Sequence, residues 1–346
     1  MLKKIKILLL LVFFYYIAKG QNEVDALRYS QFYYGGTSRY VGASGAFGAV
    51  GGDLSAVSIN PAGIGIYRGS EFSFSPSLAT QSTTSKYFGN AAEDGKINFN
   101  FNNIGVVLAE LKDDNDKFSQ WKATQLAFTY NRLNNFNNRI SISGINPENS
   151  LLDQYAAQIK GTNPGNMGSI DPFGASLAWN TFLINPVDSI DSTSYSGVVS
   201  DGGVRQRKSI TTSGGISEIS ISIGGNYDNK LYIGGAFSFP IINYSEQSEY
   251  SESDESDTIP YISSFRMGNK LLTSGSGFNF KFGMIYRAAD WIRIGGAIHT
   301  PTFYKLNDEY QSEMTSYFDS VPVWSSSLSK EYSEKSPDGN FDYRLI

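Results

Sequence analysis

The chain has 346 residues, of which 14% are aromatic and only 18% are charged, with 35 glycines and no cysteine. The aromatic content excludes a disordered chain, and the lack of cysteine excludes disulfides, thiolate metal sites and a cysteine nucleophile. The net charge of -5 argues against a nucleic-acid partner, because no basic patch offsets the acidic balance. The mean hydropathy of -0.25 is compatible with a transmembrane barrel, whose strands alternate apolar and polar side chains.

The N-terminus has the layout of a secretory signal peptide. A lysine-rich start precedes an apolar run from Ile7 to Ala18, which is followed by Lys19-Gly20-Gln21. This run is too short to cross about 30 Å of hydrocarbon as a helix. We therefore predict that residues 1–20 are a cleaved signal peptide, with an uncleaved signal anchor as the alternative. No later run is long and apolar enough for a transmembrane helix, so any membrane span must be built from strands.

A glycine-rich stretch, Gly35–Gly69, follows the apolar N-terminus and contains ten glycines. Glycine weakens helices and gives a strand no side chain to pack, but it lets a backbone approach a surrounding wall closely. We interpret the stretch as an internal plug inside a β-barrel. It carries the triplet Asn60, Pro61 and Ala62, for which a simple turn is the alternative, since Asn before Pro favours turns.

The rest of the chain alternates apolar and polar residues in a way that predicts strands. In Lys96–Leu111 the alternation changes register at Asn102-Asn103, which predicts a β-bulge. Lys281, Arg287 and Arg293 are expected on the lumen face or near an interface, because a basic residue facing lipid at mid-bilayer costs roughly 2–4 kcal/mol. The expected strands lie in Glu71–Leu78, Lys96–Leu111, Lys122–Tyr130, Arg139–Ile145, Ile219–Tyr227, Leu231–Phe239, Phe278–Tyr286 and Ile292–Ile298.

Short and long connections are expected to alternate, as in outer-membrane barrels with short periplasmic turns and long outer loops. Short turns are predicted at 132–138, 228–229 and 288–290, with 112–118 on the outer side. Long loops are predicted at 146–215, 247–270 and 307–337. The acidic run within Tyr244–Asp257 is interpreted as a solvated outer loop, with a Ca²⁺ site as the alternative.

These patterns predict an all-β fold, a transmembrane antiparallel β-barrel with about eight strands in this chain. An eight-stranded barrel is filled by its own side chains and has no room for a plug. We therefore expect the chain to be part of a longer protein whose C-terminal strands are missing. Residues 21–69 are then the plug, and residues 70–346 are the strands and loops of an incomplete barrel.

The segment Tyr34–Phe74 resembles the N-terminal region of the FadL/TodX outer-membrane transport family, in its Bacteroidetes-like form. Asn60-Pro61-Ala62 is similar to that family's hatch motif, and Tyr130–Asn135 to a recurring turn. The resemblance implies a 14-stranded barrel with an N-terminal hatch in its lumen. It also implies uptake of hydrophobic compounds, such as long-chain fatty acids or aromatic hydrocarbons. These would enter at a groove among the outer loops and leave sideways at an inward strand kink near the hatch motif.

Two apolar segments are candidates for the outer ligand groove. The spacing within Ser150–Ile159 predicts a short helix with an apolar stripe, and a second apolar piece spans Phe173–Leu183. The alternative is that both simply cap the mouth of the barrel. The candidate groove residues are Leu151, Leu152, Tyr155, Ile159, Phe173, Leu177, Trp179 and Phe182.

The sequence offers little for catalysis, because His299 is the only histidine. We therefore predict no enzyme, no catalytic residues, no metal and no cofactor. The predicted function is passive uptake of hydrophobic small molecules or lipids by a monomer in the outer membrane, in contact with outer-membrane lipid. The alternative is a barrel associated with secretion, similar to type IX secretion components, that binds partner proteins through its outer loops. A lipid-modifying enzyme is a third reading, which the single histidine disfavours.

Overall fold

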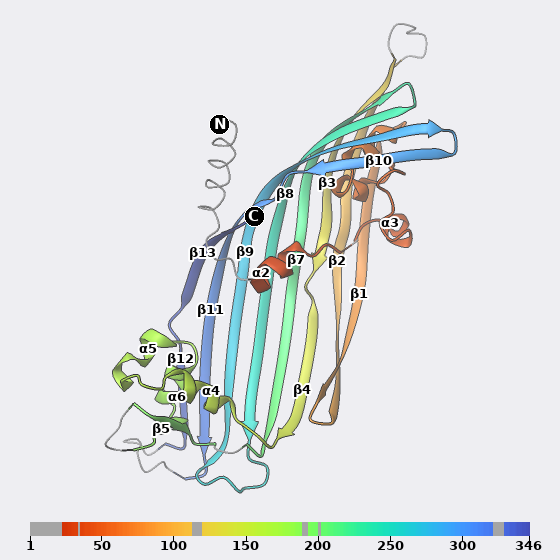
Figure 1. Ribbon diagram of the computed structural model, residues 1–346. Coiled ribbons are helices and arrows are strands. Elements are labelled where there is room, and N and C mark those ends of the chain that lie inside the picture. The colour runs from red at the N-terminus through yellow and green to blue at the C-terminus, as the bar shows by residue number, and fades with distance from the viewer. Residues whose placement is uncertain (1–22, 34, 113–119, 189–192, 200–201, 321–328) are drawn as a thin grey trace, which may run out of the picture.

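The structure, a computed structural model, describes residues 23–33, 35–112, 120–188, 193–199, 202–320 and 329–346. The predicted signal peptide lies outside these residues. Most of the described chain forms one antiparallel sheet of eleven strands, and a second, two-stranded sheet joins β5 (Ile184–Pro186) to β6 (Tyr195–Gly197) (Figure 1). The expectation of an all-β fold is confirmed at this level.

In three cases, two strands of the large sheet lie end to end and pair with the same neighbouring strand, so that together they form one strand line. β3 and β4 pair with successive parts of β7, β10 and β11 with successive parts of β9, and β13 and β12 with successive parts of β11. The described sheet therefore has eight strand lines, and no ladder between its described strands joins β1 to the β12–β13 line. The strands are β1 (Glu71–Tyr87), β2 (Asn90–Leu111), β3 (Trp121–Asn135), β4 (Asn138–Asn146), β7 (Val204–Tyr227), β8 (Leu231–Ser253), β9 (Ile262–Ala289), β10 (Ile292–His299), β11 (Phe303–Phe318), β12 (Glu331–Lys335) and β13 (Gly339–Leu345).

Two local predictions are confirmed. Asp228 and Asn229 both have φ of 53°, the left-handed backbone that a tight hairpin between β7 and β8 requires. The β1–β2 ladder passes from Ser75–Asn103 to Pro76–Phe101, so Asn102 is the extra residue of a bulge.

The turn predicted at 132–138 is wrong. The chain does not reverse there, because β4 continues beside β7 where β3 stops. Phe136 N donates to Gly214 O (3.1 Å), and the Arg132 guanidinium donates to the same carbonyl (2.6 Å). Gly214, at φ 103°, shapes β7 opposite the interruption. β3 therefore begins, at Trp121, at the same end of the sheet as the β7–β8 turn. The predicted outer connection 112–118 lies, apart from Lys112, outside the described residues.

The predicted long loops at 146–215, 247–270 and 307–337 are shorter than expected. β7 begins at Val204, β8 runs to Ser253 and β11 to Phe318, so much of the acidic run is strand. Serine and glutamate at outward positions resemble a loop in the sequence, but neighbouring strands pair their backbones. The polar ends of these strands extend the sheet well past its apolar part.

Helical elements pack at two places. The N-terminal ones are α2 (Glu23–Ser30), α3 (Ser38–Gly42) and the 3₁₀ turns η1 (Leu54–Ser58) and η2 (Pro61–Ile66). A second group lies at the end of the strands opposite the β7–β8 turn (Figure 1). It consists of α4 (Leu151–Gln158), η3 (Pro164–Asn166), α5 (Met167–Ile170) and α6 (Ala175–Asn180). The described helices are short, and none has the length and apolar character needed to cross a membrane.

Candidate functional site

The two faces of the large sheet differ sharply where the N-terminal elements pack. The covered face, against which these elements lie, carries buried polar side chains such as Gln125, Ser220, Ser238 and Lys281. The opposite, uncovered face carries large apolar side chains that are 39–78% exposed. We call these residues the apolar band: Phe72, Phe74, Leu78, Ile97, Phe99, Phe101, Leu126, Phe128, Ile219, Ile221, Ile223, Phe237, Phe239, Phe278, Phe280, Phe282, Met284, Tyr286, Ile294, Ile298 and Phe303.

The apolar band has defined borders. Along β9 it runs from Phe278 to Tyr286, about 27 Å at roughly 3.4 Å per residue. Towards the β7–β8 turn it ends at aromatic residues, where the rings of Trp121 and Tyr227 meet edge to face at 5.4 Å. Towards α4–α6 the outward positions become polar or charged, as at Arg266.

The three basic residues expected away from the middle of an apolar face all avoid it. Lys281 is buried on the covered face, between the exposed Phe280 and Phe282. Arg287 pairs with Asp290 (2.6 Å) near the β9–β10 turn. Arg293 donates to the carbonyl of Val50 (3.1 Å). Val50 belongs to the described residues 23–33 and 35–69, which we call the N-terminal segment.

Asn60 fixes the predicted motif to the covered face. Its Oδ1 accepts from Ala62 N (3.0 Å) and caps η2, while its Nδ2 donates to Gly48 O (2.7 Å) and lies 3.4 Å from the carbonyls of Met284 and Gly296. All three motif residues are buried. The motif thus joins the N-terminal segment to β9 and β10.

Glycines of the sheet allow the motif to approach this closely. A Cβ at Gly283 would overlap the Asn60 amide, one at Gly234 would overlap Pro61 O, and one at Gly224 would lie 2.5 Å from Ile64 Cγ1. These glycines come from β9, β8 and β7. The close fit therefore depends on bare backbone on three neighbouring strands.

Asp53 holds the remainder of the segment together. Its carboxylate accepts from Ser55 N (2.9 Å), which caps η1, and from Thr37 Oγ1 (2.6 Å), which caps α3. Arg39 Nε lies 3.4 Å from the same carboxylate. One buried acid thus connects two helical turns of the segment.

A cavity of about 430 Å³ lies between this segment and the sheet. On one side it is lined by aromatic residues, including Phe32, Tyr33 and Tyr40. On the other side it meets Lys281, which is bound to Glu218 and so carries no uncompensated charge into the cavity. The remaining lining residues are Gly35, Ser55, Ser58, Ile59, Asn131, Leu133, Pro240, Asn279, His299, Thr300, Thr302 and Tyr304.

His299 lies in this cavity wall, where its Nε2 is 2.8 Å from Ile59 O. No acid–base partner was predicted for it, and its contact is with the backbone of the N-terminal segment. The sequence analysis missed the cavity's polar residues Glu218, Asn279 and Thr302. For Glu218 and Asn279 the available signal was their position on the polar side of strands whose other side is apolar, whereas Thr302 lies between β10 and β11 and had no such signal.

The wall has a seam between β2 and the β3–β4 line. The β2–β3 ladder stops at Asn103–Asn131, and no described ladder joins β2 to β4. Side chains bridge the seam instead: Asn103 Nδ2 donates to Asn131 Oδ1 (2.6 Å) and Asn135 Nδ2 to Asn98 Oδ1 (3.0 Å). Lys96 Nζ also crosses it to a carbonyl of β7 (2.8 Å).

The N-terminal segment touches the seam through η1. Asn131 Nδ2 donates to Leu54 O (3.2 Å) and Ser58 Oγ (3.1 Å). The Asn60 motif itself lies against β8, β9 and β10, away from the seam and near the interruption between β10 and β11. Of the asparagines that bridge the seam, only Asn135 lies in the stretch 132–138 that the sequence predicted to be a turn.

The predicted groove residues come together at the far end of the sheet. Leu152, Tyr155, Ile159 and Leu177 are buried in one core, and Leu151, Trp179 and Phe182 pack against it. Phe173 instead meets the ring of Tyr310 at 5.0 Å. The predicted helix is confirmed as α4, with Ser150 as its N-cap.

A cavity of about 710 Å³ beside α4 includes Leu151 and Tyr155 but is lined mainly by polar side chains. The role of the eight residues in ligand capture therefore stays a prediction.

In the described ranges, no three His, Asp or Glu side chains are grouped so that they could hold a metal ion. The described site therefore combines a partly aromatic cavity, a lysine whose charge is neutralised by Glu218, and a seam in the sheet that only side chains bridge. Comparison of the chain with protein-family models, with curated proteins and with solved structures gives no match.

Proposed function

We propose that this chain forms part of the wall, and the hatch, of an outer-membrane β-barrel. The barrel takes up small hydrophobic compounds passively. Residues 35–69, within the predicted plug of residues 21–69, act as the hatch, and the large sheet acts as the wall. Candidate solutes are long-chain fatty acids and aromatic hydrocarbons, as the resemblance to the FadL/TodX family implies.

The inverted distribution of side chains carries this proposal. A water-soluble sheet buries its apolar face, whereas here the apolar band is uncovered and the covered face is polar. An exposed apolar area of this extent marks contact with lipid or another partner. Its length along β9 suits a transmembrane band about 25 Å tall, bordered by aromatic residues.

The cavity and the seam supply a route for a solute. The aromatic side of the cavity would bind an apolar body, and burial of apolar surface contributes about 25 cal/mol per Å². The seam lacks backbone hydrogen bonds between strands, so opening it breaks only side-chain contacts. Movement of η1, which contacts Asn131, would couple the hatch to a sideways exit through the seam.

Uptake of a panel of labelled fatty acids and aromatic hydrocarbons tests the proposal. Cells with the protein are compared with cells that lack it, after fractionation shows in which membrane it resides. Faster uptake of at least one apolar class, without faster uptake of polar solutes of similar size, is the expected result. Residence in the outer membrane with no difference for any apolar solute would overturn it.

A secretion-associated barrel is the second candidate. The observation that favours it is the apolar core of α4–α6, which buries most of the predicted groove residues instead of leaving them to line an open apolar groove. Mass spectrometry of the purified protein separates the two. Co-purified apolar solute supports uptake, whereas a solute-free barrel that binds secreted proteins supports secretion.

A further inference from the structure

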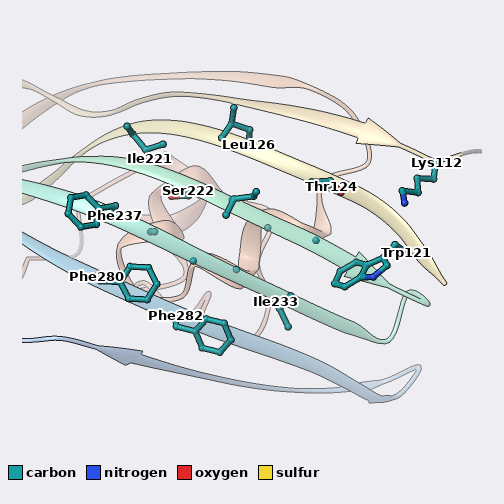
Figure 2. A pocket seen from close by; sticks show the side chains of 16 residues that line it. Lys112, Trp121, Thr124, Leu126, Ile221, Ser222, Ile233, Phe237, Phe280 and Phe282 are labelled. Carbon is teal, nitrogen blue, oxygen red and sulfur yellow. The ribbon is translucent and has the colours of Figure 1, made fainter. Parts of the chain in front are cut away.

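The uncovered face of the sheet has a recess of about 690 Å³ that the proposed uptake route does not use. It crosses β3, β7, β8 and β9 within the apolar band (Figure 2). Its floor is formed at Gly225 and Gly235, which pair with the outward residues Ile233 and Ile223 and so lie where a side chain would point outwards. The surrounding wall consists of Leu126, Ile221, Phe237, Phe280 and Phe282.

One end of the recess is polar. Figure 2 shows Trp121 and Lys112 together at this end, beyond the isoleucine and phenylalanine side chains. Trp121 pairs with Tyr227, the last residue of β7, so this end lies at the border of the apolar band. The Trp121 ring covers Gly225, where an added Cβ would lie 2.7 Å from it. Lys112 is exposed.

We propose that the recess binds the acyl chain of one phospholipid, whose phosphate contacts the ammonium group of Lys112. A flexible chain can reach a floor that consists of glycines on two neighbouring strands with larger side chains around it, whereas the flat face of a second sheet cannot. Tryptophan and lysine at the border of an apolar band are the residues that meet lipid headgroups. Among the described residues that line the recess, Lys112 carries the single charge, and its positive sign complements a phosphate diester.

The recess lies directly behind the motif on the covered face. Gly224 and Gly234 adjoin its glycine floor, and their inward sides face Ile64 and Pro61. Only sheet backbone therefore separates the recess from η2, and Figure 2 shows helical turns behind these strands. A bound acyl chain would support the thin part of the wall against which the motif packs.

The test uses native mass spectrometry of the whole protein after incubation with phosphatidylglycerol in mixed micelles. Gly235→Leu fills the recess from its floor, where an added Cβ is 3.6 Å from Phe280 and fits. Gly296→Leu is the matched control, because it adds leucine to an exposed position of β10 with no atom within 4 Å. Lys112→Gln removes the charge, and Lys230→Gln, at the β7–β8 turn, is its control.

We expect one retained phospholipid in the unmodified protein and both controls, and at least a severalfold loss in Gly235→Leu and Lys112→Gln. Equal retention in Gly235→Leu, or dimers in place of retained lipid, overturns the site. Retention of uncharged diacylglycerol equal to that of phosphatidylglycerol overturns the role of Lys112. The inference rests on the proposed membrane location, and fractionation distinguishes the failures: a membrane-resident protein without retained lipid refutes the lipid site alone.

Discussion

Lys281 Nζ lies 2.5 Å and 2.7 Å from the two carboxylate oxygens of Glu218, and both side chains are buried on the covered face of the sheet. Lys281 belongs to β9 and Glu218 to β7, so the pair spans the intervening strand β8. Each charge depends on the other, because an ion in a buried position is costly when it is unpaired.

Loss of Lys281 alone should therefore destabilise the protein strongly. We expect Lys281→Met to lower the free energy of unfolding by about 3–5 kcal/mol, since it leaves the Glu218 carboxylate buried without a partner. Denaturant unfolding in micelles, followed by tryptophan fluorescence, measures the change. The double variant Lys281→Met with Glu218→Leu should recover most of the loss, and a double variant as unstable as the single one would contradict this account.

Asn60→Ala should loosen the N-terminal segment from the sheet. The variant loses the cap of η2 and the hydrogen bonds to Gly48 and β9–β10, and a lost cap alone costs about 1 kcal/mol. Hydrogen exchange within residues 48–66 should accelerate. Asn163→Ala is a matched control, because Asn163 caps η3 in a similar Asn-Pro sequence on another part of the molecule. Unchanged exchange in Asn60→Ala would contradict the anchoring role.

Strand positions and faces were largely predictable from the sequence. Alternation along Phe278–Tyr286 placed Lys281 on the side opposite the phenylalanines, because side chains of a strand point to alternate faces. The bulge at Asn102 was predictable for the same reason, since an extra residue changes the phase of the alternation. These features depend on local geometry alone.

Features that depend on neighbouring strands were not predictable. Asn134 to Asn138 has turn-forming residues, but the ladder with β7 keeps the chain extended on either side of Phe136. The acidic end of β8 lacks an apolar face and so resembles a loop. The Glu218–Lys281 pair joins positions far apart in the sequence, and no spacing rule indicates such a contact.

A crosslink across the seam should block the proposed exit. The chain has no cysteine, so Asn98→Cys with Asn135→Cys introduces the only two thiols, at side chains now 3.0 Å apart. Joining them with a short bifunctional thiol reagent should abolish most uptake, and a cleavable reagent should allow recovery after reduction. Val106→Cys with Phe128→Cys is the control, because these residues already pair within the β2–β3 ladder. Uptake that persists in the crosslinked seam would place the exit elsewhere.

Glu252 of β8 should anchor the start of α4 to the sheet. Its carboxylate accepts from Ser150 Oγ (2.6 Å), Leu151 N (2.8 Å), Tyr250 OH (2.5 Å) and Gln206 Nε2 (3.1 Å). Glu252→Ala leaves these donors without an acceptor and should cost roughly 2–4 kcal/mol, at about 1 kcal/mol for each lost bond. Proteolysis between residues 147 and 203 should become faster, and Glu252→Gln, which keeps one acceptor oxygen, should have the smaller effect.

The connection between β8 and β9 should loosen in acid. Glu255 Oε2 accepts from Arg205 Nε (2.6 Å), and Arg207 Nη2 donates to Oε1 (2.9 Å). The hydrogen bond from Arg205 and the charges of both arginines lower the pKa of Glu255 below its usual value. Its contribution to stability is therefore complete above the usual pKa of about 4.3 and is lost as the pH falls through the lower folded value.

The effect on this connection is local, because Glu255 is exposed and water screens its charges. Hydrogen exchange of residues 254–261, corrected for the intrinsic effect of pH, should be constant from neutral pH to about 5 and should rise below about 4. In Glu255→Gln the exchange should be faster at neutral pH and the acid-dependent rise should be smaller. An equal rise in the variant would assign the acid sensitivity to a different group, with Asp254 the nearest candidate, because its carboxylate accepts from Ile259 N (2.5 Å) in the same connection.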